Sequence, residues 1–322
     1  HCVTGVQTCA LPILPMRPEG YDWRQYLPGD TSETLWSEYL PFEKLPQVRN
    51  PASGFVQNCN STPYRTTIGP ENPRPEDYSP AFGIEEDMTN RALRALELFG
   101  NDDAITEEAF YAYKYDWKYS TESHAAKLRD KILTELETED PIVIEALDIL
   151  RNWDLSADPE NTGTAVAILA MEPVVRAELF GRPAPDLVEL FQEKARALQE
   201  NFGRIDVPWK EVNRLVRGEL SLGMGGGPDV LHAVYGDWKG THLEGVAGDC
   251  YILMVTRDPD GGVRSRSIHQ FGSATLDESS PHYADQAPLF AARETKPVRL
   301  DKEDLRQHLS AEYRPGEARP AL

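Results

Sequence analysis

Positive charge and long apolar runs are both scarce in this chain of 322 residues. Lys and Arg number 33 against 53 Asp and Glu, which gives a formal net charge of −20 at pH 7. This charge repels phosphate backbones and anionic membrane surfaces, so the sequence argues against nucleic acid as a partner. No apolar run approaches the roughly 20 residues of a membrane-spanning helix, so no membrane span is expected. With 40% hydrophobic residues, the chain can still bury a sizeable core.

Several well-known catalytic signatures are also missing. No Ser lies in a Gly-x-Ser-x-Gly elbow. The histidines that follow His1 lack metal-site spacing, namely His124, His232, His242, His269, His282 and His308. His282 and Asp285 together suggest acid/base chemistry, but such a pair in a Pro-containing turn is more often structural. Residue types alone therefore indicate no complete active site.

The first thirteen residues are expected not to belong to the natural protein. Val3–Ile13 matches one frame of a common short-read sequencing adapter, in which GCT CTT CCG ATC encodes Ala10–Ile13. We therefore interpret residues 1–13 as a sequencing-adapter artefact and not as a signal peptide. The natural protein is then expected to begin upstream of this sequence.

Cysteine is too scarce for a disulfide framework. Of the four cysteines, Cys2 and Cys9 fall in the adapter-like segment, which leaves Cys59 and Cys250. These two could pair in an oxidising compartment or could both be buried thiols, and the sequence leaves the choice open.

The most informative stretch is Gly54–Asn60. Phe55–Gln57 is a short strand-like run, and Pro63 ends the segment. On a strand, the side chains of Asn58 and Asn60 would share one face. Two amides on one face indicate either a polar site or a pair that only ties the turn, since Asn commonly bonds to its own backbone.

The remainder of the chain divides into a helical region and a sheet-forming region. Apolar residues recur at helical spacing through residues 85–215, and these stripes predict a packed core. From residue 218 the pattern changes: Cys250–Val255 predicts a buried strand, and Asp258–Gly262 predicts a hairpin turn. Gly223–Pro228 predicts a tight turn, because no Lys follows it as a phosphate loop would require.

Three blocks in the same order resemble the penicillin acylase family of N-terminal nucleophile hydrolases. They are Asn50–Asn60, Gly226–Tyr235 and Ser280–Phe290, and they are most similar to the aculeacin and acyl-homoserine-lactone acylases. The resemblance implies an α+β fold, the αββα sandwich, here its C-terminal portion with a large helical insertion. Residues 14–322 would be the C-terminal part of the larger (beta) chain, with a helical region at 85–215 and a sheet-returning region at 218–300.

The resemblance also implies a function. In this family a zymogen cuts itself into two chains, and a Ser at the new N-terminus hydrolyses the amide of a small acyl-amide substrate. This sequence would lack that Ser and would be inactive alone, needing the missing alpha chain and the N-terminal part of the beta chain. The family implies a periplasmic or secreted protein, with roles in antibiotic metabolism or quorum quenching.

Two site residues follow from the resemblance. Asn60 matches the oxyanion-hole Asn of the family, and Arg91 aligns with an Arg that helps to hold that Asn and the binding pocket. No cofactor is expected. The resemblance also allows for a structural calcium, which some family members bind, with Asp77 or Asp87 as the residue to compare; neither fits the pattern, and no metal is assigned.

The sequence leaves some alternatives open. A non-catalytic binding protein could use the same scaffold, since the nucleophile is missing from the sequence. Penicillin, a lipopeptide and an acyl-homoserine lactone all remain candidate substrates.

Overall fold

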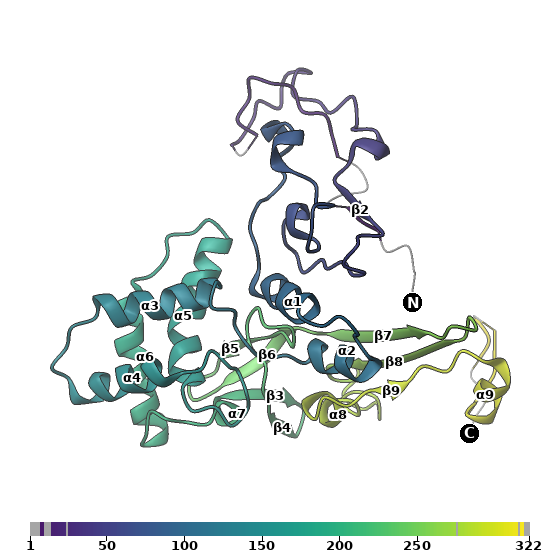
Figure 1. Cartoon of the computed structure of the whole chain (residues 1–322). Coiled ribbons are helices and arrows are strands. Elements are labelled where there is room, and N and C mark those ends of the chain that lie inside the picture. The colour runs from purple at the N-terminus through teal and green to yellow at the C-terminus, as the bar shows by residue number, and fades with distance from the viewer. Residues whose placement is uncertain (1–6, 10–13, 24, 275, 315, 319–322) are drawn as a thin grey trace. The chain divides into compact units, whose positions relative to one another are not determined.

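The computed structural model describes residues 7–9, 14–23, 25–274, 276–314 and 316–318 (Figure 1). The chain divides into two compact units, which are described separately. The first contains Val3–Val216 and Ser221–Gly248, and the second consists mainly of Arg217–Leu220 and Asp249–Leu322.

Helices dominate the first unit between residues 85 and 215. They are α1 (Asn90–Gly100), α2 (Glu107–Lys114), α3 (His124–Glu135), α4 (Pro141–Asn152), α5 (Thr164–Leu179), α6 (Leu187–Phe202) and α7 (Trp209–Val212). Local sequence sets several of their ends: Asp186 accepts a hydrogen bond from the Glu189 N–H at the start of α6, and Gly203 ends that helix in the left-handed conformation.

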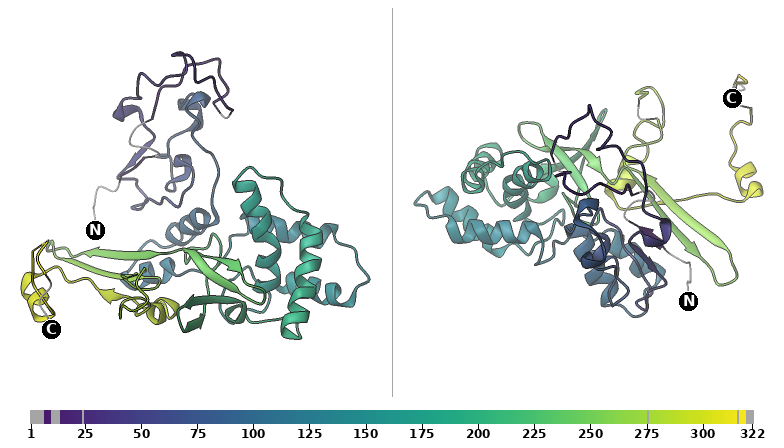
Figure 2. Two further views of the ribbon diagram at one scale, coloured as in Figure 1. Left: turned by 180° about the vertical axis from the view of Figure 1, so that it is seen from behind. Right: turned by 90° about the horizontal axis from the view of Figure 1, so that it is seen from above.

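The core of the first unit lies among α3, α4, α5 and α6, which contact one another (Figure 2). Helix α5 is the most enclosed, because every residue from Thr164 to Met171 is buried. Its small alanines allow close approach by neighbouring helices, and the fully buried Phe191 and Leu198 of α6 belong to the same core.

A four-stranded sheet lies mainly in the first unit. Its order is β4 (Leu220–Gly223), β3 (Asn213–Arg217), β6 (Leu243–Gly248) and β5 (Val234–Trp238). Strand β3 runs parallel to β6, and β5 runs antiparallel to β6 with an irregular register between Tyr235 and Gly236. Between β4 and β5 the chain forms a turn at Pro228 and Asp229. The turn predicted for Gly223–Pro228 is therefore displaced, because Gly223 ends β4 and only Pro228 lies in the turn.

The second unit contains a three-stranded sheet in the order β7 (Tyr251–Arg257), β8 (Val263–His269) and β9 (Lys296–Pro297). It also contains α8 (Ala287–Ala291) and α9 (Lys302–Gln307). The predicted hairpin turn joins β7 to β8. The prediction of a buried strand at Cys250–Val255 was wrong for four of its six residues: only Ile252 and Met254 are buried, whereas Leu253 is 48% exposed. Alternation along β7 buries only one face of the hairpin.

The predicted strand at Phe55–Gln57 is also wrong. This segment is irregular in the structure. The Gln57 N–H donates to Thr66 O at 2.8 Å, and Gln57 Nε2 donates to Arg65 O at 2.9 Å. The loop at Arg65 and Thr66 thus accepts these hydrogen bonds in place of a neighbouring strand.

Most of the adapter-like segment at residues 1–13 lies outside the described residues. Within it, β1 (Gln7–Cys9) pairs antiparallel with β2 (Gln47–Arg49), and its interpretation as an artefact stays a prediction. Across the described part of the chain, no helix is both long enough and apolar enough to cross a membrane.

Candidate active site

Asn60 adopts a left-handed backbone conformation, with φ of 56°. Asn tolerates this region better than most residues. The Asn58 side chain stabilises the bend, because its Oδ1 accepts the Asn60 N–H at 3.2 Å. Asn58 therefore acts on the backbone of the turn, while the Asn60 side chain stays exposed.

The first turn of α1 holds the bend from the other side. Thr89 is the N-cap of α1: its Oγ1 accepts the Ala92 N–H at 3.2 Å. The same hydroxyl donates to the carbonyl of Cys59 at 2.8 Å. Two residues later, Arg91 Nη2 donates to Asn60 Oδ1 at 3.1 Å. One helix end thus contacts both the backbone and the side chain of the bend.

The bond from Arg91 determines which way the Asn60 amide faces. A guanidinium can only donate hydrogen bonds, so the atom facing it must be the oxygen. The two N–H groups of Nδ2 therefore point away from Arg91, and no described residue accepts a bond from them. Contact with a cation also polarises the amide, which makes Nδ2 a stronger donor.

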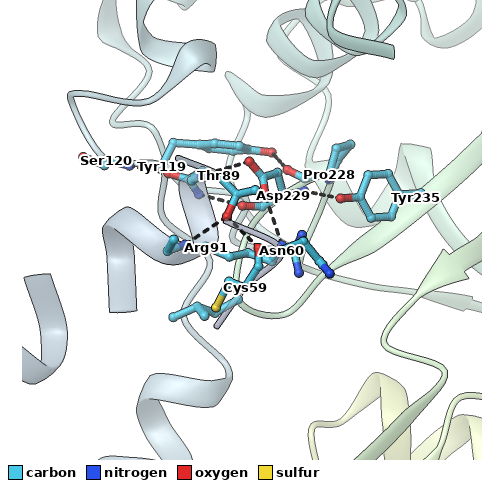
Figure 3. Close-up of polar contacts among 12 residues, drawn as sticks. Cys59, Asn60, Thr89, Arg91, Tyr119, Ser120, Pro228, Asp229 and Tyr235 are labelled. Atoms are coloured by element: carbon cyan, nitrogen blue, oxygen red, sulfur yellow. Dashed lines mark hydrogen bonds and ion pairs between the residues drawn. The ribbon is translucent and has the colours of Figure 1, made fainter. Parts of the chain in front are cut away.

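Asp229 connects Arg91 to a second part of the first unit (Figure 3). Its Oδ1 accepts from Arg91 Nε at 3.0 Å, and its Oδ2 accepts the Asn90 N–H at 2.6 Å. The carboxylate thus lies at the N-terminus of α1, where the helix dipole favours negative charge. Like Asn60, Asp229 has a positive φ, here 58°. The Tyr235 hydroxyl accepts the Asp229 N–H at 3.3 Å.

Asn90 is a buried junction beside this pair, with 4% of its surface exposed. Its Nδ2 donates to the carbonyls of Asp229 at 2.8 Å and Lys118 at 3.1 Å. Its Oδ1 accepts the Ser120 N–H at 2.8 Å. Because these bonds use both ends of the amide, Asn90 holds the Asp229 turn and the residue 118–120 loop against α1.

The electrostatics of the site keep Arg91 charged. Burial lowers the pKa of Arg91, but the hydrogen bond and the negative charge of Asp229 outweigh it, so the net pKa lies above its ordinary value. Burial, with Asp229 as the next cause, also raises the pKa of the Tyr119 and Tyr235 hydroxyls. Both phenols stay neutral near pH 7.

The structure brings together the two residues predicted from the sequence, Asn60 and Arg91, although their roles stay predictions. Sequence reasoning missed Asn90 and Asp229. Asn90 adjoins Arg91 in the chain, and Asp229 follows a Gly-Pro pair in the second family-like block, so their positions gave a weak signal. His282 Nδ1 and Asp285 Oδ2 lie 2.9 Å apart on an exposed turn of the second unit.

Asp77 and Asp87 are the residues compared above with a possible calcium ligand. Asp77 is exposed and pairs with Arg74 at 2.7 Å. The Asp87 carbonyl accepts the Thr62 N–H at 2.9 Å. Nowhere in the described part of the chain do three His, Cys, Asp or Glu side chains gather closely enough to hold a metal.

Comparison with known proteins gave three results. A family model described as Penicillin amidase matches residues 7–307. Penicillin G acylase of Escherichia coli is 43% identical over 51 residues, which are 16% of this chain and 6% of that protein. The solved structure of a thermostable penicillin G acylase from Alcaligenes faecalis is similar with a TM-score of 0.53 at 16% identity, covering 94% of this chain and 64% of that chain.

The structural likeness establishes the fold. It confirms the predicted α+β class and the N-terminal nucleophile hydrolase fold. The chain spans less than two thirds of the length of either of these two proteins.

Proposed function

The chain belongs to the penicillin amidase family, and we propose that it supplies the oxyanion-stabilising part of an acylase that hydrolyses an amide to release an acyl group. The observation that carries the proposal is the Asn60 amide. Arg91 binds its oxygen at 3.1 Å, so its N–H groups face away as unoccupied donors. Such a pre-oriented donor suits the negative oxygen of a tetrahedral intermediate.

In the proposed reaction, an N-terminal Ser of the complete protein attacks the amide carbonyl carbon, and its own α-amine takes the hydroxyl proton. The carbonyl oxygen becomes negative, and Asn60 Nδ2 donates to it. The C–N bond then breaks and the leaving amine receives the proton. Water hydrolyses the resulting acyl ester. Arg91 and Asp229 hold Asn60 and touch no reacting atom, so we assign them positioning roles.

The finer identity of the enzyme is part of the same proposal. The three family-like blocks favour the aculeacin and acyl-homoserine-lactone branch, a self-cleaving precursor with a companion alpha chain, and a periplasmic or secreted location. Penicillin G acylases are among the proteins found by comparison, so phenylacetyl amides are a further substrate class to test.

The test uses the full-length protein with phenylacetyl amides and acyl-homoserine lactones. We expect hydrolysis of at least one class. We expect Asn60→Ala to lower kcat by roughly 10²- to 10³-fold, because one oxyanion donor is removed. Asn152→Ala is the matched control, since Asn152 is exposed at the end of α4, remote in sequence from the site.

Circular dichroism must show that the Asn60→Ala protein is folded. An Asn60→Ala protein with full activity would disprove the oxyanion role. Saturable binding of these substrates without any hydrolysis by the unsubstituted protein would instead favour the alternative class, a non-catalytic binding protein on this scaffold.

A further inference from the structure

A cavity of about 340 Å³ lies within the first unit, apart from Asn60 and Arg91. Its lining comes from α5, α6, α7 and strands β3, β5 and β6. Much of this lining is apolar and includes Ile168, Leu169, Trp209, Pro228, Val234 and Leu243. Volumes of this size are typical of small-molecule sites.

One buried polar side chain in the lining lacks a partner for its oxygen. Asn213 is 1% exposed. Its Nδ2 faces the carbonyls of Met224, Gly225 and Gly226 at 3.3 to 3.4 Å, which identifies that atom as the nitrogen. No described residue donates to Asn213 Oδ1. Because Asn213 lines the cavity, a ligand that carries an N–H or O–H group could donate to this oxygen and would gain a hydrogen bond by binding there.

The charged part of the lining favours an anion. Three cations line the cavity, Arg176, Arg182 and Lys194, against two carboxylates. Both carboxylates lie near Arg176: Glu172 Oε1 is 2.6 Å from Arg176 Nε, and Asp237 Oδ1 is 3.9 Å from Arg176 Nη1.

Arg182 is the cation that remains available. It pairs with no carboxylate in the described part of the chain, and its guanidinium lies 5.4 Å from the Phe180 ring. Lys194 by contrast pairs with Glu193 at 2.6 Å. In a chain with a net charge of −20, an accessible cation beside an apolar cavity gives local selectivity for a negative group.

We propose that this cavity binds a small organic acid in which an apolar ring or chain joins a carboxylate to an N–H or O–H donor. The carboxylate pairs with Arg182, the donor reaches Asn213 Oδ1, and the apolar body packs on Ile168, Trp209 and Val234. The site does not depend on the proposed acylase function, because neither Asn60 nor Arg91 lines it.

The experiment is calorimetric titration of the full-length protein with indole-3-acetate, which has an aromatic body, an N–H and a carboxylate but no amide to hydrolyse. Two analogues each remove one feature: 1-methylindole-3-acetate lacks the N–H, and indole-3-ethanol lacks the carboxylate. We expect saturable binding of indole-3-acetate and, for each analogue, an affinity about tenfold lower, the effect of losing roughly 1.4 kcal/mol.

Substitutions in the protein show which residue causes each loss of affinity. Arg182→Gln should lower the affinity for indole-3-acetate about tenfold and leave the affinity for indole-3-ethanol unchanged. Arg151 is an exposed arginine of α4, so the control Arg151→Gln should change neither affinity. Asn213→Leu should remove the difference in affinity between indole-3-acetate and 1-methylindole-3-acetate. Since Arg182 is exposed, its variant tests the site even if Asn213→Leu fails to fold.

Two results would overturn the proposal. One is the absence of saturable binding by the unsubstituted protein, as expected if another part of the complete protein fills the cavity. The other is binding that survives Arg182→Gln but is lost in Asn60→Ala, because this would place the probe at the catalytic residue.

Discussion

At the residue scale, Asp229 joins two parts of the candidate site. One carboxylate oxygen meets Arg91 at 3.0 Å, and the other meets the first N–H of α1 at 2.6 Å. Arg91 in turn is the residue that orients the Asn60 amide. The orientation of the Asn60 amide, the proposed oxyanion donor, therefore depends on the charge of Asp229, to which we assign a positioning role.

Substitution of this pair tests the dependence. In Asp229→Asn, Arg91 loses its counter-charge, and we expect kcat for amide hydrolysis to fall by about tenfold with KM nearly unchanged, because only transition-state binding is affected. Arg91→Lys should lower kcat at least as much, because an ammonium group cannot reproduce the planar guanidinium that donates to both Asp229 and Asn60. Steady-state kinetics on the full-length enzyme measure both effects.

Asp148→Asn is the control for this pair, because Asp148 forms a comparable ion pair with Arg151 on the surface of α4. Equal losses in Asp148→Asn and Asp229→Asn would argue against a specific positioning role. An increase in KM with kcat intact would point to Arg91 as a substrate-binding residue instead.

At the element scale, the turn that carries Asp229 requires a glycine. Gly226 has φ of 80°, and a Cβ at this position would lie 2.4 Å from the carbonyl oxygen of His232. Its own carbonyl accepts from Trp209 Nε1 at 2.6 Å, and its N–H donates to Ala157 O at 2.9 Å. The turn therefore has no room to move away from an added methyl group.

Gly226→Ala should therefore destabilise the protein by more than the 1 to 2 kcal/mol, roughly, of the left-handed conformation alone. Gly240→Ala is a matched control, because Gly240 has φ of 88° but open space around it. Denaturant unfolding measures both changes in the free energy of unfolding. Equal destabilisation in the two variants would mean that the turn relaxes around the methyl group.

The ends of helices were more predictable than the exposure of strands. Asp186 caps the start of α6, Pro141 opens α4 and Gly203 ends α6, which are the positions that these residue types favour. Thr121 and Ser123 both offer a hydroxyl near the start of α3, and the cap is Ser123, whose Oγ accepts the Ala126 N–H at 3.1 Å. Two hydroxyl residues so close in sequence offer the same capping chemistry, and only packing selects between them.

At the scale of the whole molecule, acidity is the dominant property. With a net charge of −20, the carboxylates repel one another near neutral pH, but many of them pair with arginines. Hydrogen bonds from Arg196, Arg204 and Arg264 lower the pKa of Asp140, Asp206 and Asp258, respectively. These pairs lie at the protein surface, so each contributes modestly.

The lowered pKa values predict acid destabilisation. A carboxylate whose pKa is lower in the folded state stabilises the protein above its unfolded pKa of about 4, and this stability is lost as pH falls through the folded pKa. We therefore expect Tm, measured by calorimetry, to fall steeply below about pH 4. In the triple variant with Asp140, Asp206 and Asp258 all changed to Asn, Tm should fall less steeply as the pH decreases.

Asp103→Asn is the control for the pH series, since Asp103 is exposed and forms no ion pair among the described residues. Its Tm profile should follow that of the unsubstituted protein. A triple variant with an unchanged acid profile would show that other groups cause the acid transition.

The sequence by itself predicted helices between residues 85 and 215 and the hairpin turn at Asp258–Gly262. Its resemblance to a known family supplied the α+β class and the proposal that Asn60 and Arg91 belong to the site. These features depend on local patterns and on residues close together in the chain. Tertiary structure alone decided that Asp229, 138 positions from Arg91, completes the pair, and that Asn213 lines a cavity with its Nδ2 facing three backbone carbonyls. Both outcomes arise when folding brings distant segments together, because hydrogen-bond partners across such separations leave no periodic trace in the sequence.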